Sequence, residues 1–476
     1  MRLPGRAASW ATVGALYAVA FMAQTWNLGR TVRPALDEGV YLYAARLITE
    51  GWLPHRDFFM SHPPYTLFGA AAGLGLTGFD VPAFSTLYAA WVLSTLFPLF
   101  FAVEEATGSR LAAALSGILF VTYPEFALWD ARFFAVRQAS LPFLAFALWF
   151  LVGRRRTTVA GVLLGLFALG VVAHAALAVL ILAGFLFGER LASPRPLREI
   201  LFENRWLLGA FVVTTAAGYA AVLAVPNGAA NLFGYQIERP AFPVVRRVES
   251  LTKGFLPLNA AILVTGIAGS FLLRSRGGGI GLANLAGLPL FLFGFRSFYP
   301  HYLTSFAVTL AFGGGLFVAR VLRLPTPRWL APALLLGTIG VTSFPRLRDD
   351  LIRHRTPEFF RVVAALRGAS DPLFAFEPIY ALYASRRLTP HYHVADMRAF
   401  RTMERGVPDE LWNDLYRRSR TILVEPFFAS QMTPERWRVL ETECDLVFSD
   451  RWHRIYVRRA GKDAGLSSGG TPPASR

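Results

Sequence analysis

Two adjacent carboxylates, Asp37 and Glu38, lie just beyond the first long apolar run of the chain, residues 9–28. A run of about 20 apolar residues can cross a bilayer. A carboxylate costs about 2.5–3.5 kcal/mol inside hydrocarbon, but it is tolerated where a span meets water. There it can act as a general base that removes a proton from a hydroxyl group. The pair therefore indicates either solvated loop acids or a catalytic site at a membrane surface.

A short helix and a proline pair follow the acids. Residues 37–48 have helical spacing of apolar side chains. This helix is too short to span a bilayer, so we expect it to lie in the membrane interface. His62 precedes Pro63 and Pro64, which favour an extended entry to the next helix. Residues 64–78 are apolar but short, and we expect a second interfacial helix there.

Long apolar blocks dominate the chain of 476 residues, 54% of which are hydrophobic. Soluble domains average about 45–50%. The blocks predict a mainly α-helical, polytopic transmembrane bundle with about 11–13 spans. His174 lies between two blocks and is expected to be a packed or interfacial histidine. The eleven candidate spans are residues 9–28, 83–103, 111–129, 137–152, 157–173, 174–188, 206–225, 255–274, 279–295, 300–322 and 328–344.

Arginine-rich loops orient these spans. With the N-terminus in the cytoplasm, the loops that begin near Arg154, Arg190, Arg274 and Arg320 lie inside, in agreement with the positive-inside rule. The loops 29–82, 130–136 and 226–254 then lie outside. The formal net charge of +17 is spread over many loops, so it suits anionic membrane lipids better than nucleic acid, which we exclude as a partner.

Several arginines nevertheless fall in the segments expected outside. Arginine forms bidentate hydrogen bonds with phosphate, so the set favours a phosphate site, although an outer loop can carry any one of them without a function. The residues are Arg56, Arg132, Arg239, Arg246, Arg247 and Arg296.

A polar stretch after Pro345 predicts a soluble α/β domain outside the membrane. Residues 356–367 have helical spacing, and short apolar runs typical of strands occupy residues 373–376, 421–424, 446–448 and 454–457. The one cysteine, Cys444, excludes an intramolecular disulfide. We expect a transmembrane domain at 1–345 with its catalytic outer loop at 29–82, the extracytoplasmic domain at 346–460, and a disordered tail, rich in Gly, Ser and Pro, at 461–476.

Residues 35–65 resemble the first outer loop of the GT-C superfamily of integral-membrane glycosyltransferases, and the layout of spans and external tail is similar too. The nearest branches are the bacterial relatives of protein O-mannosyltransferases and of lipid A aminoarabinose transferase. The resemblance implies transfer of a sugar from a polyprenyl-phosphate donor to a lipid, glycan or protein acceptor. It also implies a bacterial plasma membrane, with the active site on its outer side.

The family pattern implies roles for individual residues. It places the catalytic aspartate at Asp37, with Glu38 and Asp130 as supporting acids. Because arginine binds phosphate well, Arg132, Arg239 and Arg296 are the candidates for the donor phosphate, together with His62. Arg137, Arg246 or Arg247 could replace any of these arginines. Arg56, Asp57, Tyr299, His301 and Tyr302 would bind substrate. One branch has lysine where this chain has His62, and a neutral histidine offers only one donor, so this position departs from the pattern.

Displacement by a single base predicts inversion at the anomeric carbon. The alternative function is a transporter or flippase of a lipid-linked or anionic substrate. Transporters typically contain internal repeats and polar sites at the bilayer midplane, and the sequence shows neither feature. No nucleotide-binding or metal-binding motif occurs, so no cofactor is assigned. A divalent metal between Asp37 and Asp130 stays an alternative to the base.

Overall fold

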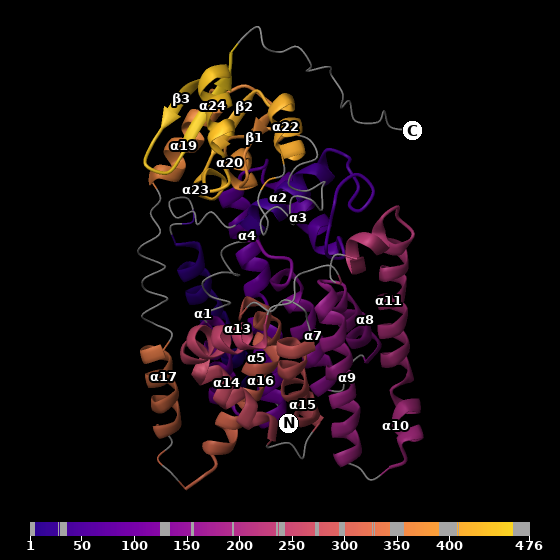
Figure 1. Cartoon of the computed structure of the whole chain (residues 1–476). Coiled ribbons are helices and arrows are strands. Elements are labelled where there is room, and N and C mark those ends of the chain that lie inside the picture. Colours follow the sequence, from indigo (N-terminus) through magenta and orange to yellow (C-terminus); the bar gives the residue numbers. More distant parts are fainter. Residues whose placement is uncertain are drawn as a thin grey trace. The chain divides into compact units, whose positions relative to one another are not determined.

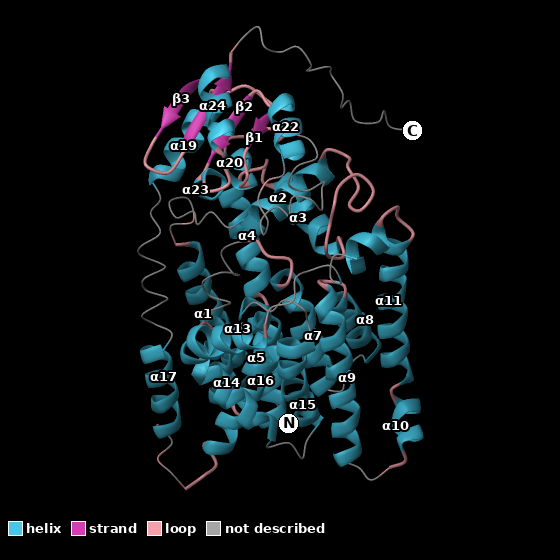
Figure 2. Cartoon of the chain, in the orientation of Figure 1, coloured by secondary structure: helices cyan, strands magenta, loops and turns pink. Residues whose placement is uncertain are grey.

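The computed structural model consists mainly of helices, with one small sheet (Figures 1 and 2). It describes residues 5–26, 28, 36–123, 134–153, 157–192, 195–234, 237, 243–271, 276–294, 300–325, 327, 329–342, 357–389, 407 and 409–459.

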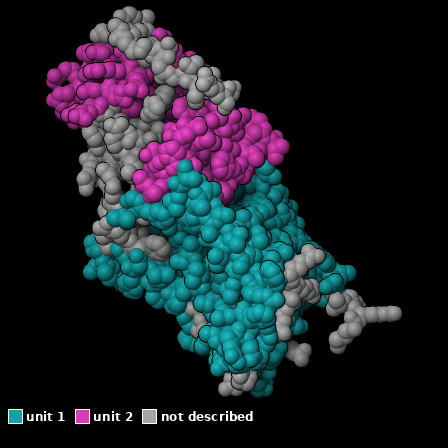
Figure 3. Space-filling view, turned by 90° about the vertical axis from the view of Figure 1, so that its right-hand side faces the viewer, with its two compact units in different colours: residues 1–28, 85–224, 232–353 teal, residues 29–84, 225–231, 354–476 magenta. Residues whose placement is uncertain are grey.

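The chain divides into two compact units (Figure 3). Unit 1 comprises residues 1–28, 85–224 and 232–353, and unit 2 comprises residues 29–84, 225–231 and 354–476. Residues 29–84 therefore cluster with C-terminal residues in unit 2. A division of the sequence at residue 345 separates these two segments. The domain boundaries drawn from the sequence stay predictions.

The described residues of unit 1 form helices joined by turns and loops, and no strand lies among them. Its helices are α1 (Gly5–Thr25), α5 (Leu96–Thr107), α6 (Arg110–Val121), η2 (Gln138–Ser140), α7 (Leu141–Val152), α8 (Thr157–Ala168), α9 (Val172–Ala192), α10 (Leu197–Glu203), α11 (Arg205–Leu223), α13 (Val244–Glu249), η4 (Ser250–Phe255), α14 (Leu256–Phe271), α15 (Arg276–Pro289), η5 (Leu290–Gly294), η6 (Pro300–Phe306), α16 (Ala307–Val321) and α17 (Leu330–Thr342). Two helices, α4 (Val81–Leu93) and η3 (Ala230–Gly234), have residues in both units.

Among the described residues, five helices are long and apolar enough to cross a membrane: Arg6–Thr25, Val81–Thr107, Val172–Ala192, Arg205–Leu223 and Tyr302–Val321. Shorter apolar helices cover Arg110–Val121, Gln138–Val152, Thr157–Ala168, Asn259–Phe271, Gly279–Pro289 and Pro332–Thr342. Each of the eleven candidate spans overlaps one of these helices. One more short apolar helix, Tyr65–Leu76, falls where the sequence predicts an interfacial helix.

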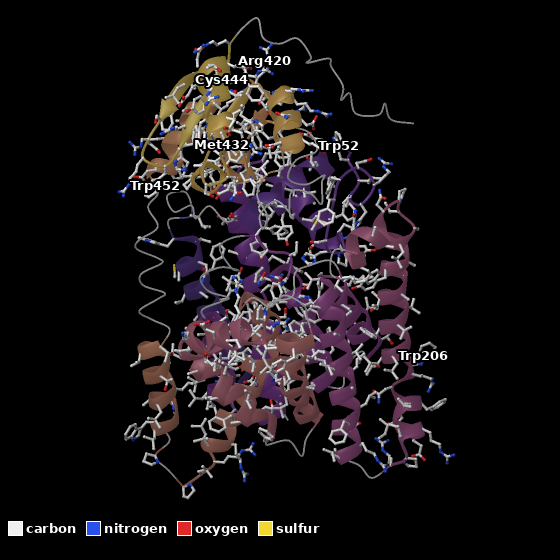
Figure 4. All side chains as sticks on the ribbon, in the orientation of Figure 1. Trp52, Trp206, Arg420, Met432, Cys444 and Trp452 are labelled. Carbon is white, nitrogen blue, oxygen red and sulfur yellow. The ribbon has the colours of Figure 1, made fainter. Side chains whose placement is uncertain are left out.

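Glycines let the apolar helices of unit 1 approach closely. The backbones of α9 and α15 meet at Gly184 and Gly279, where neither residue has room for a Cβ atom. Gly269 on α14 meets the backbone of Gly313 on α16 in the same way. Lipid tails are as apolar as the side chains, so the hydrophobic effect does not drive helices together in a membrane. Close backbone contact provides van der Waals packing in its place. Trp206, at the start of α11, is 63% exposed (Figure 4), which is typical of an aromatic anchor at the membrane–water interface.

Unit 2 combines a helical pair with an α/β domain. The helices are α2 (Leu36–Thr49), α3 (Tyr65–Leu76), α19 (Pro357–Arg367), α20 (Pro378–Tyr383), α22 (Asp409–Arg418), α23 (Pro426–Ala429) and α24 (Pro434–Glu443). The strands are β1 (Leu373–Phe374), β2 (Thr421–Val424), β3 (Cys444–Ser449) and β4 (Arg454–Arg458).

The four strands form one sheet in the order β1-β2-β4-β3. β1 and β2 are parallel, with Leu373 opposite Thr421, and the other pairs are antiparallel. A core of Phe374, Trp412, Ile422 and Phe428 joins the sheet to α22 and α23. The predicted α/β character of this region is confirmed, and β1 is shorter than the apolar run that predicted it.

Candidate functional site

Helix α2 carries the acidic pair. Asp37 occupies its first turn, and the side chain of Asp37 lies outside the described residues. The positive end of a helix dipole favours an ionised carboxylate at such a position. Glu38 is buried, at 4% exposure. Burial raises the pKa of Tyr383 on α20, and the charge of Glu38 raises it further. Glu38 therefore lies near Tyr383 of α20, and its supporting role in catalysis stays a prediction.

The C-terminal residues of unit 2 hold α2 in place. A Cβ atom at Gly39 would lie 2.7 Å from the backbone nitrogen of Ile379, so only glycine fits there. The backbone N–H of Leu388 donates to the Tyr43 hydroxyl at 2.8 Å. Arg46 Nη1 donates to the carbonyl of Arg386 at 3.0 Å. These contacts join residues about 340 positions apart in the sequence, which explains why the sequence patterns missed them.

His62 lies close to the face of α2 that includes position 37. Its ring centroid is 6.3 Å from that of Tyr41, and His62 itself is buried. Tyr41 follows Asp37 by four residues, and residues four apart share one face of a helix. The structure therefore brings His62 beside the helix that carries the predicted base. Its role in phosphate binding stays a prediction.

Arg56 and Asp57 pair with each other in the loop between α2 and α3. Arg56 Nε and Nη2 donate to the two carboxylate oxygens of Asp57 at 2.8 and 2.7 Å. This pairing lowers the pKa of Asp57. The backbone N–H of Leu53 donates to the same carboxylate at 2.7 Å. The pair fixes the loop, and a role in substrate binding stays a prediction.

The neighbouring residue His55 was not recognised from the sequence. It is 2% exposed and has a φ angle of +67°. No sequence signal marked it, because a lone histidine carries no spacing pattern.

Unit 1 contains an apolar cavity of about 650 Å³ between α14, α15 and η4. The lining residues are apolar apart from their backbone and include Leu256, Leu263, Phe271, Leu288, Phe293 and Leu303. The cavity is open on one side, since Phe271 is 70% and Phe293 57% exposed, and its lining suits an apolar group.

Two candidate arginines of unit 1 have described contacts, and one of them, Arg247, contacts a residue that lines this cavity. Arg247 on α13 is 6% exposed, and its Nη1 donates to the carbonyl of Phe293 at 3.5 Å. The guanidinium of Arg137 lies 4.0 Å from the ring centroid of Tyr302, the residue before Leu303. Arg137 and Arg247 are both among the arginines that the sequence predicts as replacements in phosphate binding. Tyr302, a predicted substrate-binding residue, makes a cation–π contact with Arg137.

His174 is a packed histidine, as the sequence predicts. It is fully buried. Its Nδ1 lies 3.1 Å from Ser140 Oγ and its Nε2 lies 2.8 Å from Ser305 Oγ. Both ring nitrogens are thus hydrogen-bonded, and the ring joins α9 to η2 and η6.

The remaining candidates lie outside the described residues: Asp130, Arg132, Arg239, Arg296, Tyr299 and the side chain of His301. Their grouping into one site stays a prediction. Among the side chains that the structure does describe, no group of three His, Cys, Asp or Glu is close enough to hold a metal ion. Asp37 and Asp130 are not part of that set.

Comparison with known proteins gives a match in structure and none in sequence. No family model and no curated protein matches the chain. ArnT from Cupriavidus metallidurans bound to undecaprenyl phosphate superimposes with a TM-score of 0.68 at 15% identity, covering 95% of this chain and 99% of that one. The chain has the ArnT fold. The apo state of the same protein gives a TM-score of 0.67 at 16% identity, covering 94% of this chain and 98% of that one.

The ArnT fold extends to a third solved structure. The oligosaccharyltransferase of Archaeoglobus fulgidus, in complex with Zn and sulfate, gives a TM-score of 0.53 at 12% identity, covering 93% of this chain and 73% of that one. ArnT, a lipid A aminoarabinose transferase, and this oligosaccharyltransferase are both GT-C proteins. The fold that the first outer loop predicts is therefore confirmed.

Proposed function

We propose that the protein is a membrane glycosyltransferase that moves a sugar from a polyprenyl-phosphate donor to an acceptor hydroxyl outside the cytoplasm. The acceptor belongs to a lipid, a glycan or a protein. The observation that carries the proposal is the apolar cavity with buried Arg247 at its wall, in a chain with the ArnT fold.

A lipid phosphate matches both parts of that arrangement. An isoprenoid tail is apolar, so it can pack against a cavity lined with Leu, Phe and Val, and in lipid such packing supplies the favourable contacts. Arg247 is a charged residue whose side chain contacts a residue of that lining. Its planar guanidinium forms bidentate hydrogen bonds with phosphate. In the relative with this fold, ArnT, the bound lipid is undecaprenyl phosphate.

The reaction needs a base, an electrophile and a stabilised leaving group. Asp37 accepts the proton of the acceptor hydroxyl. The resulting oxygen nucleophile forms a bond to the anomeric carbon while the bond from that carbon to the phosphate oxygen breaks. Polyprenyl phosphate leaves with the electron pair, and arginine side chains stabilise its charge. One displacement inverts the anomeric carbon. The proposed setting is the bacterial plasma membrane, with Asp37 on the outer side.

Reconstitution tests the proposal. The purified protein is placed in vesicles with a panel of polyprenyl-phosphate sugars and an extract of envelope acceptors, and the lipid that co-purifies is identified by mass spectrometry. We expect a bound polyprenyl phosphate or its glycosylated form, and sugar on an acceptor. Movement of intact lipid-linked sugar across the vesicle membrane, without transfer, would favour the transporter alternative.

A further inference from the structure

His55 is a buried imidazole in the loop between α2 and α3. It is 2% exposed, and neither Nδ1 nor Nε2 has a hydrogen-bond partner within the part of the chain that the structure describes. A buried group left unsatisfied costs about 1–3 kcal/mol, so native proteins keep few of them. A phenyl ring would fill nearly the same space without this cost.

The backbone at His55 carries a second cost. Its φ of +67° lies in the left-handed region, which costs a residue other than glycine about 1–2 kcal/mol. The turn that imposes this angle is well fixed, because the N–H of His55 donates to the carbonyl of Phe58 and the N–H of Asp57 donates to that of Leu53, both at 2.9 Å. Strain that the surroundings maintain in this way is typical of functional sites.

The position of His55 connects it to the candidate site. The backbone of His62 lies close to the His55 imidazole and raises its pKa, although no atom of it meets the distance and angle of a hydrogen bond. The ring of His62 in turn lies next to Tyr41, one helical turn after Asp37. His55 therefore belongs to the same part of unit 2 as the predicted base.

The charge state of His55 decides which ligand it suits. Burial lowers the pKa of His55 to about 4, and the backbone of His62 opposes the shift only in part, so the ring is neutral at neutral pH. A neutral imidazole has one N–H donor and one lone-pair acceptor. A hydroxyl group also donates and accepts, whereas a phosphate oxygen only accepts and favours charged donors. The unused pair of nitrogens matches a hydroxyl.

We propose that His55 is a sugar-binding residue, which exchanges hydrogen bonds with a hydroxyl group of the glycosyl ligand. The proposal rests on the proposed function, because it assigns a hydroxyl-recognising group to the same site. The competing explanation is an ordered water molecule that satisfies the ring and has no role in recognition.

Three variants test it: His55→Phe, His55→Asn and, as a matched control, His174→Phe. We expect His55→Phe to unfold at the wild-type temperature or above, because it removes two unsatisfied atoms. His174→Phe should unfold at a lower temperature, because Ser140 and Ser305 lose their partner. Transfer by His55→Phe should fall about 10- to 100-fold, the loss expected for one hydrogen bond to a substrate.

His55→Asn should retain more transfer, because asparagine keeps a donor and an acceptor and tolerates a positive φ. In a set of monodeoxy donors, each donor lacks one hydroxyl group of the sugar. With the donor that lacks the hydroxyl bound by His55, wild type and His55→Phe should transfer at equal rates. Wild-type transfer by His55→Phe with every donor would overturn the proposal, and so would a lower unfolding temperature, which would show a structural partner.

The proposed function has its own readout in the wild-type protein. If wild type transferred sugar from no donor, the proposed function would fail. His55 would then be judged by thermal protection of wild type and His55→Phe with a panel of free monosaccharides. Protection of wild type alone would support the proposal, and equal protection or none would overturn it.

Discussion

At the scale of single residues, the account depends on one carboxylate at the start of α2. Asp37→Asn removes the negative charge and keeps the shape of the side chain. A general base contributes about 10²- to 10⁴-fold, so we expect a loss of transfer in that range with unchanged folding. The measurement is sugar transfer by reconstituted protein, with the unfolding temperature as the test of folding.

Asp80 provides the matched control for that substitution. Its Oδ1 accepts a hydrogen bond from the N–H of Ala83 at the start of α4. Asparagine caps helices as well as aspartate does, so Asp80→Asn should keep wild-type transfer. Equal transfer by Asp37→Asn and Asp80→Asn would remove Asp37 from the mechanism.

Arg247 is predicted to bind the donor phosphate rather than to take part in proton transfer. Arg247→Gln removes the charge, so we expect an increase of about tenfold or more in the KM for the lipid donor and less co-purified polyprenyl phosphate. The matched control is Arg205→Gln, because Arg205 stacks on Phe202 at the surface of α10. Unchanged KM in Arg247→Gln would assign the cavity to another lipid.

The sequence predicted the acidic pair and the importance of the loop around it, because acids at the end of a span are visible in a linear pattern. It did not predict His55, and it ranked Arg247 only as a replacement. The environment of both residues depends on contacts that a linear pattern does not show. The N–H of His55 donates to the carbonyl of Phe58 and closes the turn, and Arg247 donates to the carbonyl of Phe293, 46 residues later.

At the scale of elements, the packing of α2 on α20 is the contact that positions the acids. Gly39→Ala would place a Cβ atom 2.7 Å from the Ile379 nitrogen. Overpacking of this kind costs about 1–3 kcal/mol, which outweighs the gain of up to about 1 kcal/mol in helix propensity. We expect a lower unfolding temperature and reduced transfer.

Gly69 on α3 is the matched control, because an added Cβ there meets no atom within 4 Å. Gly69→Ala should therefore raise the unfolding temperature slightly. If Gly39→Ala were as stable as Gly69→Ala, α2 and α20 would not be in close contact.

Two buried carboxyls beside α20 predict a stability that depends on pH. Glu425 Oε1 accepts a hydrogen bond from the N–H of Glu377 at 2.7 Å. Burial raises the pKa of Glu425 to about 8 and that of Glu377 to about 7. Tyr380, whose hydroxyl lies 2.8 Å from His453 Nε2, and Asp450 beside His453 complete the titratable surroundings.

The sign follows from the raised pKa values. Above pH 4.5, the ordinary pKa of these groups, the unfolded chain releases protons that the folded chain retains, so stability falls as pH rises toward 8. We expect the unfolding temperature to be higher at about pH 5 than at about pH 8. Glu425→Gln should reduce this difference, and substitution of the exposed Glu410 on α22, Glu410→Gln, should not. A wild-type protein that gains stability over this range would contradict the assignment.

The elements themselves were largely predictable, since α19, β2 and β4 match their apolar patterns within about one residue. The short helices α20 and α23 were not, because helices of six and four residues have no detectable periodicity. The contact between α2 and α20 was also beyond sequence patterns, because glycine in a helix indicates close packing without naming the partner.

At the scale of the whole molecule, the ArnT fold persists at 15% identity over 95% of the chain. Apolar blocks define such a fold, and one apolar residue can replace another within them. That explains why the layout was predictable from one sequence. The residues that select the donor and the acceptor are positioned by loops. The amino-acid composition does not predict where these loops lie.

Membrane sidedness is a prediction at this scale. In a background without the buried Cys444, a cysteine in place of exposed Arg459 should react with a membrane-impermeant maleimide added outside intact cells. A cysteine in place of Arg195, between α9 and α10, should react only after permeabilisation. The reverse pattern would put the C-terminal residues in the cytoplasm.

The central claim is that this molecule breaks the bond between a sugar and a polyprenyl phosphate. The most direct measurement is the ratio of polyprenyl phosphate released to sugar appearing on the acceptor, in sealed vesicles that contain the purified protein. The account predicts a ratio of about one, together with inverted anomeric configuration in the product. Intact donor recovered from the opposite leaflet, with no free polyprenyl phosphate, would contradict it.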